Sequence, residues 1–512
     1  MLCVAFSAAM LGIDGYVVRV EADSSPGTPA LAIIGLPDRA LSEARERVRA
    51  AIFNSGFAYP PGRLLVNLSP ADIRKEGPSF DLPIALALLG IDEQIDRNAL
   101  QSYAALGELA LDGTLRPVNG ILPMVLGACN AGFPKLIVPR DNADEAALVE
   151  GVELYPVDSL HSAVSVVLGH GAKWRIHGRA QLPPGKEIVH ADFADVRGQV
   201  AAKRALEIAA GGGHNVIFVG PPGCGKTMLA RRLPSILPPM TSAQALEVTK
   251  IYSVAGLLGA HASIVRERPF RFPHHTISQT ALVGGGAGIV KPGEISLAHH
   301  GVLFLDELPE FTRSAIEVMR QPLEEGAVTI ARSAGTFTYP ARFTLVASMN
   351  PCPCGYRGTR SSECRCDDAA VSRYVSKLSG PLLDRIDLQI EISRVPFDDM
   401  VRAESAERSA KIRERVMAAR ERQARRFSGA PYACNAEIPS NAIRTHCELD
   451  SGAMQLLAHA SAKRQFSARA LDRIARAART IADLAESTPI RTEHVAEAIH
   501  YRSLERLDSR AA

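Results

Sequence analysis

Residues 220–227 read Gly-Pro-Pro-Gly-Cys-Gly-Lys-Thr. This octapeptide matches GxxxxGK[ST]. It follows the apolar stretch 215–219 and precedes a stretch, 226–233, with a helical pattern. A strand, a glycine-rich turn and a helix in this order are the context in which backbone N–H groups surround phosphate. We therefore expect Lys226 to reach the β- and γ-phosphates and Thr227 to bind Mg²⁺. The expected nucleotide-binding residues are Gly220, Pro221, Pro222, Gly223, Cys224, Gly225, Lys226 and Thr227.

A second apolar strand is predicted over 301–305 and ends in two carboxylates, Asp306 and Glu307. Asp306 is expected to hold Mg²⁺ through its water shell, and Glu307 to polarise an attacking water as a general base. An Asp-Glu pair also follows many strands as an ordinary loop. The phosphate loop earlier in the chain favours the functional interpretation.

A third strand, 343–349, ends at Asn350. An amide at this position orients the water or contacts the γ-phosphate. The alternative is a turn residue that satisfies the sterics of the following Pro351.

The composition is that of a folded chain with several cores. At about 100–200 residues per domain, 512 residues correspond to two to four domains. The content of 46% hydrophobic and 22% charged residues excludes a disordered chain. A net charge of +3 and 5% aromatic residues argue against a protein that coats DNA by charge or by a broad stacking surface, so any nucleic-acid contact must be local.

The termini and cysteines bear on location. No run of eighteen apolar residues predicts a membrane span. The apolar stretch 1–18 has no basic residue before Arg19 and is interrupted by Gly12 and Asp14, so we expect a first strand and turn rather than a signal peptide. Nine cysteines without a secretion signal predict reduced thiols and a cytoplasmic protein.

The chain divides into four predicted parts. Residues 1–168 alternate strands, at 31–35, 63–69 and 135–139, with helices such as 42–56, for which Ser42 is a candidate cap. Residues 169–191 are rich in Gly and Pro and predict a linker. Residues 192–396 repeat a strand–helix pattern, and 397–512 are helical. The predicted fold class is α/β, with a helical C-terminal part.

The phosphate loop, the Asp-Glu strand and the Asn-tipped strand, in this order, resemble a AAA+ ATPase. The longer strings FRFPHHTIS (270–278), MNPCPCGY (349–356) and LSGPLLDRIDLQIEI (378–392) resemble the ComM/YifB family of magnesium chelatase-like AAA+ proteins, and the resemblance runs the whole length. It implies a AAA+ P-loop core over 192–396, a helical C-terminal lid over 397–512, and a Lon-protease-like, ribosomal-S5-like α+β domain over 1–168.

The resemblance also implies roles for arginines. Arg385 in the LLDRID string is expected to complete the site of a neighbouring subunit as an arginine finger. The alternative is a surface ion pair with Asp384 or Asp387. Arg469 resembles the second sensor arginine. Three further arginines on the same helix are interpreted as solvated charges: Arg473, Arg476 and Arg479.

Two insertions in the core are implied. One is the glycine-rich stretch 279–294 with Lys291, and the other is a predicted hairpin, 326–343, with Arg332. In related helicases such hairpins point into a central pore, where Lys291 and Arg332 would face DNA phosphates. The alternative is an ordinary surface hairpin. His274 and His275 are expected on a strand, on opposite faces, as a structural or interface motif rather than as a shared metal site.

Four cysteines cluster within the loop 352–366. Cys352, Cys354, Cys364 and Cys366 form two CxC pairs and predict four thiolates around one Zn²⁺. The usual spacing is CxxC. Reduced loop thiols or a redox pair are the alternatives.

The stretch KEGPS sets Ser79 where the nucleophile of Lon stands. The matching position of the catalytic lysine is Leu122, and Lys75 and Lys135 lie elsewhere in the pattern. A Ser–Lys dyad needs that lysine. We therefore predict a proteolytically inactive domain that serves as a scaffold or a nucleic-acid-binding module.

The resemblance implies an ATP- and Mg²⁺-dependent motor that forms a ring, expected to be a hexamer, and acts on single-stranded or branched DNA. Helicase and branch-migration activity during natural transformation is the expected function. A metal-insertion motor of the magnesium chelatase type and a Lon-like ATP-dependent protease remain as alternatives.

Overall fold

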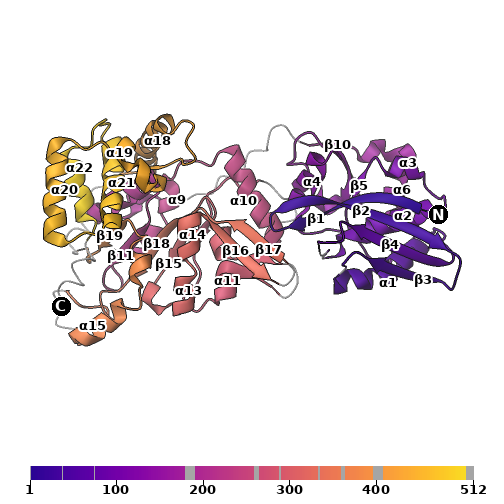
Figure 1. Ribbon diagram of the computed structural model, residues 1–512, viewed down its shortest axis with the longest axis horizontal. Coiled ribbons are helices and arrows are strands. Elements are labelled where there is room, and N and C mark those ends of the chain that lie inside the picture. The colour runs from indigo at the N-terminus through magenta and orange to yellow at the C-terminus, as the bar shows by residue number, and fades with distance from the viewer. Residues whose placement is uncertain are drawn as a thin grey trace.

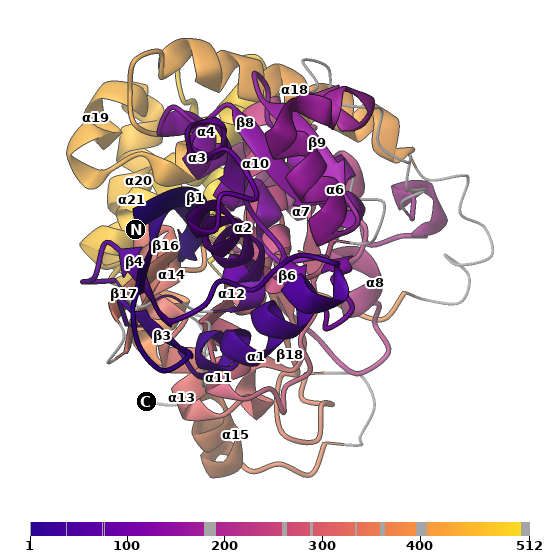
Figure 2. The same cartoon turned by 90° about the vertical axis from the view of Figure 1, so that its right-hand side faces the viewer.

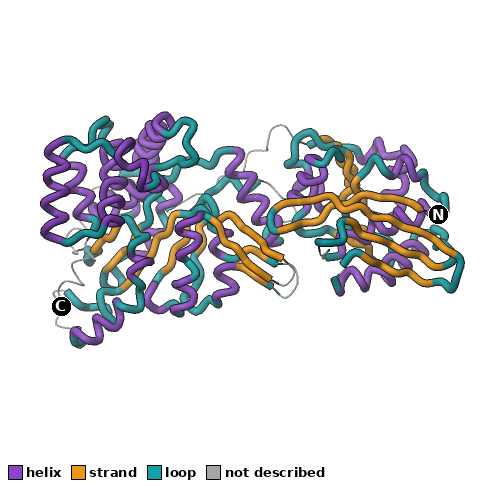
Figure 3. The backbone as a smooth tube through the Cα atoms, in the orientation of Figure 1, coloured by secondary structure: helices purple, strands orange, loops and turns teal. Residues whose placement is uncertain are grey.

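The computed structural model describes residues 2–36, 38–73, 75, 77–178, 191–258, 264–286, 290–332, 335–358, 364–395 and 407–502. The molecule is elongated, with two large sheets that follow each other along its long axis (Figures 1 and 3). The N-terminal sheet occupies one end and the C-terminal helices the other (Figure 1). No described helix is long and apolar enough to cross a membrane.

The N-terminal sheet has eight strands. Their order is β10 (Ile176–His177), β9 (Glu153–Val157), β8 (Lys135–Pro139), β5 (Ala104–Ala105), β1 (Leu2–Leu11), β2 (Asp14–Ser25), β4 (Arg63–Ser69) and β3 (Ala30–Ile34). The apolar start of the chain forms β1 and the turn to β2, which confirms its interpretation as a strand. The predicted strands over 31–35, 63–69 and 135–139 are also confirmed, as β3, β4 and β8. Strand β10 lies within the stretch expected to be a linker, whose residues 179–190 are outside the described residues.

Helices cover both faces of this sheet. Neighbouring side chains of a strand point to opposite faces, and here the apolar side chains on each face pack against a different set of helices. On β8, Ile137 packs in one apolar cluster with α1 and α2, whereas Leu136 and Val138 pack in another with α4. The helices of this region are α1 (Arg39–Asn54), α2 (Asp81–Ile91), α3 (Arg97–Leu100), α4 (Ile121–Asn130), α5 (Ala143–Ala146) and α6 (Leu160–Ser165), with a small hairpin of β6 (Glu108–Leu109) and β7 (Leu115–Arg116).

Helix α1 begins three residues before the predicted start, and the prediction of Ser42 as its cap is wrong. Asp38 caps the helix: its Oδ1 accepts the Leu41 N–H at 2.7 Å. Its Oδ2 also accepts the N–H of Gly77 at 3.1 Å. A contact with Gly77, which is distant in the sequence, therefore helps to hold Asp38 in the capping position. The sequence around the helix start does not show this contact.

The second sheet is parallel, in the order β12 (Phe270–Arg271), β15 (Val302–Leu305), β18 (Thr344–Met349), β11 (Val216–Val219) and β19 (Leu388–Glu391). All residues of β11 and β15 are buried. Strands covered on both faces are uninterrupted apolar runs, which is why the sequence pattern located them. In a parallel sheet the carboxyl ends of all strands lie at the same edge, and ligands bind just beyond that edge.

The helices around this sheet are mostly short. They are α7 (Val200–Gly212), α8 (Lys226–Ala230), α9 (Leu233–Ile236), α10 (Ser242–Ala255), α11 (Gln279–Val283), α12 (Glu294–Leu297), α13 (Arg313–Glu317), α14 (Arg320–Glu325), α15 (Asp368–Val375) and α16 (Gly380–Leu383). Two antiparallel hairpins interrupt them: β13 (Gly284–Gly285) with β14 (Lys291–Pro292), and β16 (Ala327–Arg332) with β17 (Gly335–Pro340). The longer hairpin confirms the predicted pair of strands.

The C-terminal part is helical, as predicted. Its helices are α18 (Ser409–Arg426), α19 (Ile443–His446), α20 (Ser451–Arg464), α21 (Ala468–Leu484) and α22 (Thr492–His500). They share one apolar core with α7 and one face of the parallel sheet. The interpretation of Arg473, Arg476 and Arg479 as solvated charges is wrong. Arg479 is 2% exposed, bonds the Ser487 carbonyl and pairs with Asp483, because α21 packs inside the bundle rather than on its surface.

The N-terminal region packs against the core, and in the view along the long axis it lies in front of the core (Figure 2). Ala245 of α10 belongs to the same apolar cluster as α4. The buried Glu145 carboxylate accepts hydrogen bonds from the Leu122 N–H and from the Ser253 hydroxyl of α10. At the tip between β1 and β2, a Cβ added to Gly12 would lie 3.4 Å from the Thr338 carbonyl oxygen of β17, so the two hairpins touch through backbone.

Candidate functional site: a nucleotide site at the carboxyl edge of the parallel sheet

The loop 220–225 joins β11 to α8, and its backbone geometry requires glycine at several positions. Gly223 and Gly225 have φ angles of +76° and +94°, a region that other residues rarely adopt. A Cβ on Gly220 would lie 2.3 Å from the Ile392 carbonyl oxygen, so only glycine allows this approach. A Cβ on Gly223 would meet nothing within 4 Å, so at this position the backbone conformation and not a close contact requires glycine.

Lys226 begins α8 and its side chain folds back over the loop. Its Nζ donates to the carbonyl oxygens of Gly220, at 2.6 Å, and Pro221, at 3.0 Å, and to Oδ1 of Asn350 at 3.0 Å. Burial lowers the pKa of Lys226 from its ordinary value, while the negative charge of Asp306 opposes this shift. The structure thus brings together the predicted lysine and the predicted amide, which are far apart in the sequence.

Asp306 lies beyond the end of β15, next to Thr227. The Thr227 hydroxyl donates to Oδ2 of Asp306 at 2.8 Å, and the Ser348 hydroxyl donates to Oδ1. A hydroxyl and a carboxylate at this separation form the oxygen-donor set that Mg²⁺ prefers, so these residues fit the ion. Sequence reasoning missed Ser348, although its position two residues before Asn350 on a strand sets both residues on one face.

Glu307 is held in a left-handed backbone conformation, with φ +54°. Its N–H is directed at Asp306 Oδ1, 3.1 Å away, and at Ser348 Oγ, 3.2 Å away, which fixes the turn. Its side chain is half exposed. A non-glycine residue in this region is uncommon and occurs at functional sites.

His275 lies beside Glu307, with Nδ1 3.7 Å from Oε2. The expectation that His274 and His275 sit on opposite faces of a strand is wrong. β12 ends at Arg271, and the two rings lie tilted against each other with centroids 4.1 Å apart. The short strand ends early because Pro273 cannot donate to a sheet. His275 is therefore a site residue that the sequence interpretation missed.

Gln199 is a second missed residue. It precedes α7 with φ +53°, and its amide nitrogen donates to the carbonyl oxygens of Cys224, at 3.1 Å, and Ser393, at 2.8 Å. It ties the phosphate loop to the segment after β19. Its signal in the sequence is weak, because a single Gln after Gly198 has no special pattern.

Arg385 and Arg469 are not part of this group. The Arg385 guanidinium pairs with Glu324 and donates to the Pro381 carbonyl oxygen at 2.6 Å. Its partner is thus neither Asp384 nor Asp387. Arg469 is largely exposed and lies 4.0 Å from Asp384.

Both arginines lie at the amino edge of the sheet. The Arg385 carbonyl accepts from the Asn215 side chain at 3.0 Å, and Asn215 immediately precedes β11. Asp387, just before β19, binds Arg473 of α21 at 2.6 Å. Burial alone would raise the pKa of Asp387, but Arg473 and His214 hold that pKa below its ordinary value. Helix α21 is therefore anchored at the edge opposite the phosphate loop.

Lys291 and Arg332 come close together on the two inserted hairpins. Gly285 is the strand partner of Lys291, and a Cβ on Gly285 would lie 3.0 Å from Nη2 of Arg332. Both side chains are exposed. Within the part of the chain that the structure describes, neither forms an ion pair. The turn of the longer hairpin, 333–334, lies outside the described residues.

The four cysteines of the loop 352–366 also meet. Their sulfur atoms all lie within 4.8 Å of one another.

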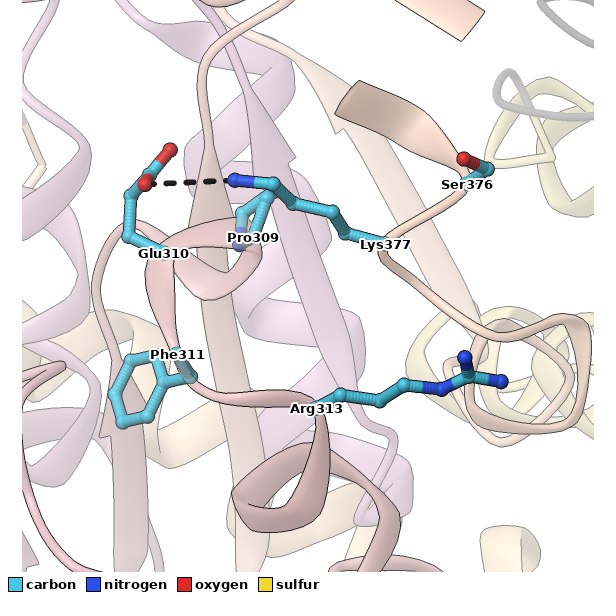
Figure 4. A pocket seen from close by; sticks show the side chains of 6 residues that line it. All are labelled: Pro309, Glu310, Phe311, Arg313, Ser376 and Lys377. Atoms are coloured by element: carbon cyan, nitrogen blue, oxygen red, sulfur yellow. Dashed lines mark ion pairs between the residues drawn. The ribbon is translucent and has the colours of Figure 1, made fainter. Parts of the chain in front are cut away.

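A hollow of about 440 Å³ opens beside the turn that carries Glu307 (Figure 4). Across it, Lys377 Nζ lies 3.6 Å from a Glu310 carboxylate oxygen, whereas Arg313 points away from this pair (Figure 4). Its lining residues are Pro309, Glu310, Phe311, Arg313, Ser376 and Lys377. None of them belongs to the phosphate loop, so this hollow is not the phosphate site.

In the N-terminal region, Ser79 and Leu122 are both buried. The Leu122 side chain is fully buried within an apolar cluster. Lys75 Nζ donates to the Ile73 carbonyl oxygen at 2.7 Å, and burial lowers the pKa of this lysine.

A parallel sheet with a phosphate loop after its β11 strand, an Asp-Glu turn and an Asn-tipped strand defines a AAA+ ATPase. The sequence profile of "Magnesium chelatase, subunit ChlI" matches residues 192–400, that of "Subunit ChlI of Mg-chelatase" matches 20–142, and that of its C-terminal part matches 406–502. ATP and Mg²⁺ are the substrate and ion that this class uses.

The chain belongs to the ComM/YifB family of magnesium chelatase-like AAA+ proteins. It is 43% identical to the YifB protein of Escherichia coli, with 99% of this chain and 98% of that protein covered. It is 42% identical to the competence protein ComM of Haemophilus influenzae, again over 99% and 98%. The Lon protease of Roseiflexus castenholzii is 33% identical over 139 residues, 26% of this chain and 17% of that protein. The Lon-like part and the helical C-terminal part fit the predicted fold class.

Proposed function

We propose that this protein is a ring-forming, ATP-hydrolysing DNA motor whose nucleotide sites lie between subunits. The observation that carries the proposal is the separation of the site into two halves. Lys226, Asp306 and Asn350 lie at the carboxyl edge of the sheet, whereas Arg385 and Arg469 lie at its amino edge.

One chain cannot join these halves. A four-residue strand spans about 13 Å, and the Arg385 guanidinium is directed to α14 and α16 rather than along the sheet. A neighbouring copy that presents its amino edge to this carboxyl edge would supply both arginines. Head-to-tail contacts of this kind leave no subunit with an unpaired edge when the subunits close into a ring. A hexamer is the ring size that the family resemblance implies.

The residues then have defined roles in hydrolysis. The water oxygen forms a bond to the γ-phosphorus as the bond to the ADP oxygen breaks, and Glu307 accepts the water proton. Lys226 and the neighbour's Arg385 stabilise negative charge on the transferred phosphoryl group, and Asn350 orients water or phosphate. Thr227 and Asp306 would hold Mg²⁺, which neutralises phosphate charge.

DNA is the proposed cargo because Lys291 and Arg332 offer two adjacent exposed cations on inserted hairpins. Exposed cations on two inserted hairpins suit a phosphate backbone better than a compact ligand. The name of the Haemophilus relative, a competence protein, agrees with helicase and branch-migration activity on DNA taken up in natural transformation. We place this activity in the cytoplasm.

Two other functions are less well supported. A metal-insertion motor needs neither a Lon-like region nor a four-cysteine loop, and stimulation of the ATPase by a chelatase partner subunit would favour it. A Lon-like protease needs a lysine to activate Ser79, but the position that the sequence resemblance assigns to this lysine is Leu122, which is apolar and buried. Casein degradation that is lost in Ser79→Ala would favour the protease.

The test mixes two inactive variants. Glu307→Gln removes the base, and Arg385→Ala removes the finger but leaves the subunit's own phosphate loop intact. If the site is shared, random mixing restores about a quarter of the interfaces, because the finger of one variant meets the base of the other. ATPase activity should therefore reappear on mixing. Mixtures that stay inactive, or an Arg385→Ala protein with full turnover, would refute the shared site. Arg413→Ala, on an exposed face of α18, is the control.

A further inference from the structure

The geometry of the four-cysteine cluster is that of a metal site. The Sγ atom of Cys364 lies 3.8 Å from that of Cys352 and 3.7 Å from that of Cys354, and the first two sulfurs are 3.3 Å apart. With Zn–S bonds of about 2.3 Å, the edges of a tetrahedron of sulfurs are about 3.8 Å long. Two of these edges match within 0.1 Å, and the distances are far longer than the 2.05 Å or so of a disulfide bond.

Backbone N–H groups support the sulfurs. Those of Tyr356 and Arg365 bond the Cys354 sulfur, and that of Cys366 bonds the Cys364 sulfur. Such bonds orient sulfur atoms that serve as metal ligands. Packing does not explain the cluster, because Cys354, Cys364 and Cys366 are only partly buried.

The cluster rests against the nucleotide site. Cys352 follows the Asn350-Pro351 dipeptide, and a Cβ on Gly355 would lie 2.7 Å from the Pro222 side chain and 3.8 Å from Cγ of Asn350. On the other side, Arg394 lies over the Tyr356 ring and reaches the Pro222 carbonyl oxygen at 3.5 Å. The loop therefore contacts both the phosphate loop and the amide that bonds Lys226.

We propose that Cys352, Cys354, Cys364 and Cys366 bind one Zn²⁺ ion, which fixes the cysteine loop against Pro222 and Asn350 and so positions the phosphate loop. Four thiolates around a single centre select zinc among common cellular metals. An iron–sulfur cluster does not fit, because its cysteines bind separate irons and lie further apart. The site is structural, since all four positions are filled by protein.

A second group of possible ligands, Glu247, His299 and His300, carries no such proposal. His299 Nδ1 accepts the Arg342 N–H at 3.0 Å, so the ring proton lies on Nε2, which faces Glu247. A protonated Nε2 is a donor to the carboxylate and not a metal ligand. In the cysteine cluster, by contrast, the grouped ligand atoms are four sulfurs and include no carboxylate.

Elemental analysis of the purified full-length protein tests the proposal, and its readout does not depend on DNA or ring formation. We expect about one zinc per chain, loss of zinc in Cys364→Ser and Cys366→Ser, and retention in Cys129→Ser, a partly buried cysteine of the N-terminal region. The kcat for ATP should fall roughly tenfold in the zinc-free variants. Wild-type protein without zinc, or zinc retained in both variants, would overturn the proposal, and iron in its place would overturn the identity of the metal.

If the serine variants fail to fold, exchange of the metal in the wild-type protein decides. Co²⁺ bound by four thiolates gives intense visible absorption and sulfur-to-cobalt charge-transfer bands. Co²⁺ bound only by nitrogen and oxygen ligands gives no such charge-transfer bands. We expect those bands with the wild-type protein and the same bands with Cys129→Ser. Wild-type protein that binds Co²⁺ without them would refute a four-thiolate site.

Discussion

Lys226 Nζ lies 3.0 Å from Oδ1 of Asn350, although 124 positions separate the two residues. This bond ties the start of α8 to the end of β18, so the lysine that is expected to hold phosphate and the amide that is expected to sense it share one hydrogen bond. When a phosphate group binds one of these two side chains, we expect the hydrogen bond to the other side chain to change.

Asn350→Ala should therefore slow turnover without removing nucleotide binding. We expect kcat to fall about 10²-fold, because one preorganised polar contact to the reacting group is lost. Lys226→Ala should abolish hydrolysis altogether. Steady-state ATPase assays and titration with a fluorescent nucleotide separate the two effects. Asn98→Ala, on the exposed side of α3, should change neither quantity. Equal losses of affinity in both site variants would contradict these roles.

We expect His275 to act on Glu307 as a positioning residue. Without the imidazole 3.7 Å away, the half-exposed carboxylate samples more rotamers. In His275→Ala we expect kcat to fall about three- to tenfold at an unchanged KM, with partial rescue in His275→Asn. His274→Ala is the matched control, since His274 bonds Thr276 instead of the carboxylate. A raised KM at constant kcat would assign His275 to substrate binding.

Arg332 should contribute to DNA binding through phosphate. Arg332→Ala should weaken single-stranded DNA binding, reduce the slope of log K against log salt by about one, and remove the stimulation of ATPase by DNA. Arg332→Lys should retain most of the slope because the charge remains. Anisotropy titrations at several salt concentrations measure this. If no DNA binds at any salt concentration, the proposed cargo is wrong.

His299 should make the fold acid-sensitive. Burial lowers its pKa to about 4, and the neighbouring His300 adds to the shift. An unfolded histidine has a pKa of about 6.5, so between these values the unfolded chain binds more protons than the folded one. The free energy of unfolding then falls with falling pH, by up to about 1.4 kcal/mol per pH unit.

Thermal unfolding between pH 7 and pH 5 measures this effect. His299→Asn retains an acceptor for the Arg342 N–H but does not titrate, so its melting temperature should change less steeply with pH. His161→Asn, at an exposed histidine, should keep the wild-type slope. Parallel slopes for all three proteins would show that His299 is not the responsible group.

Much of the core was predictable because its signals are local. β11, β15 and β18 are uninterrupted apolar runs that end in residues with clear chemistry, and the structure brings Lys226, Asp306 and Asn350 to one edge as expected. The phosphate loop needs glycines at fixed positions, which a sequence displays directly.

The rest depends on contacts between distant segments. Nothing next to Arg385 indicates that Glu324 binds it, and nothing on α21 indicates that Arg473 is anchored by Asp387. His275 was misplaced because a strand was expected where Pro273 ends it. The helix cap at Asp38 was missed because Gly77, which also binds the Asp38 carboxylate, is distant in the sequence. In each case long-range packing overrides the local pattern.

The contact between Gly12 and Thr338 sets the β16–β17 hairpin against the turn of the β1–β2 ribbon. The strands of that ribbon lie in the middle of the N-terminal sheet. If the hairpin moves during ATP hydrolysis, as the proposed function requires, we expect the N-terminal sheet to be displaced with it.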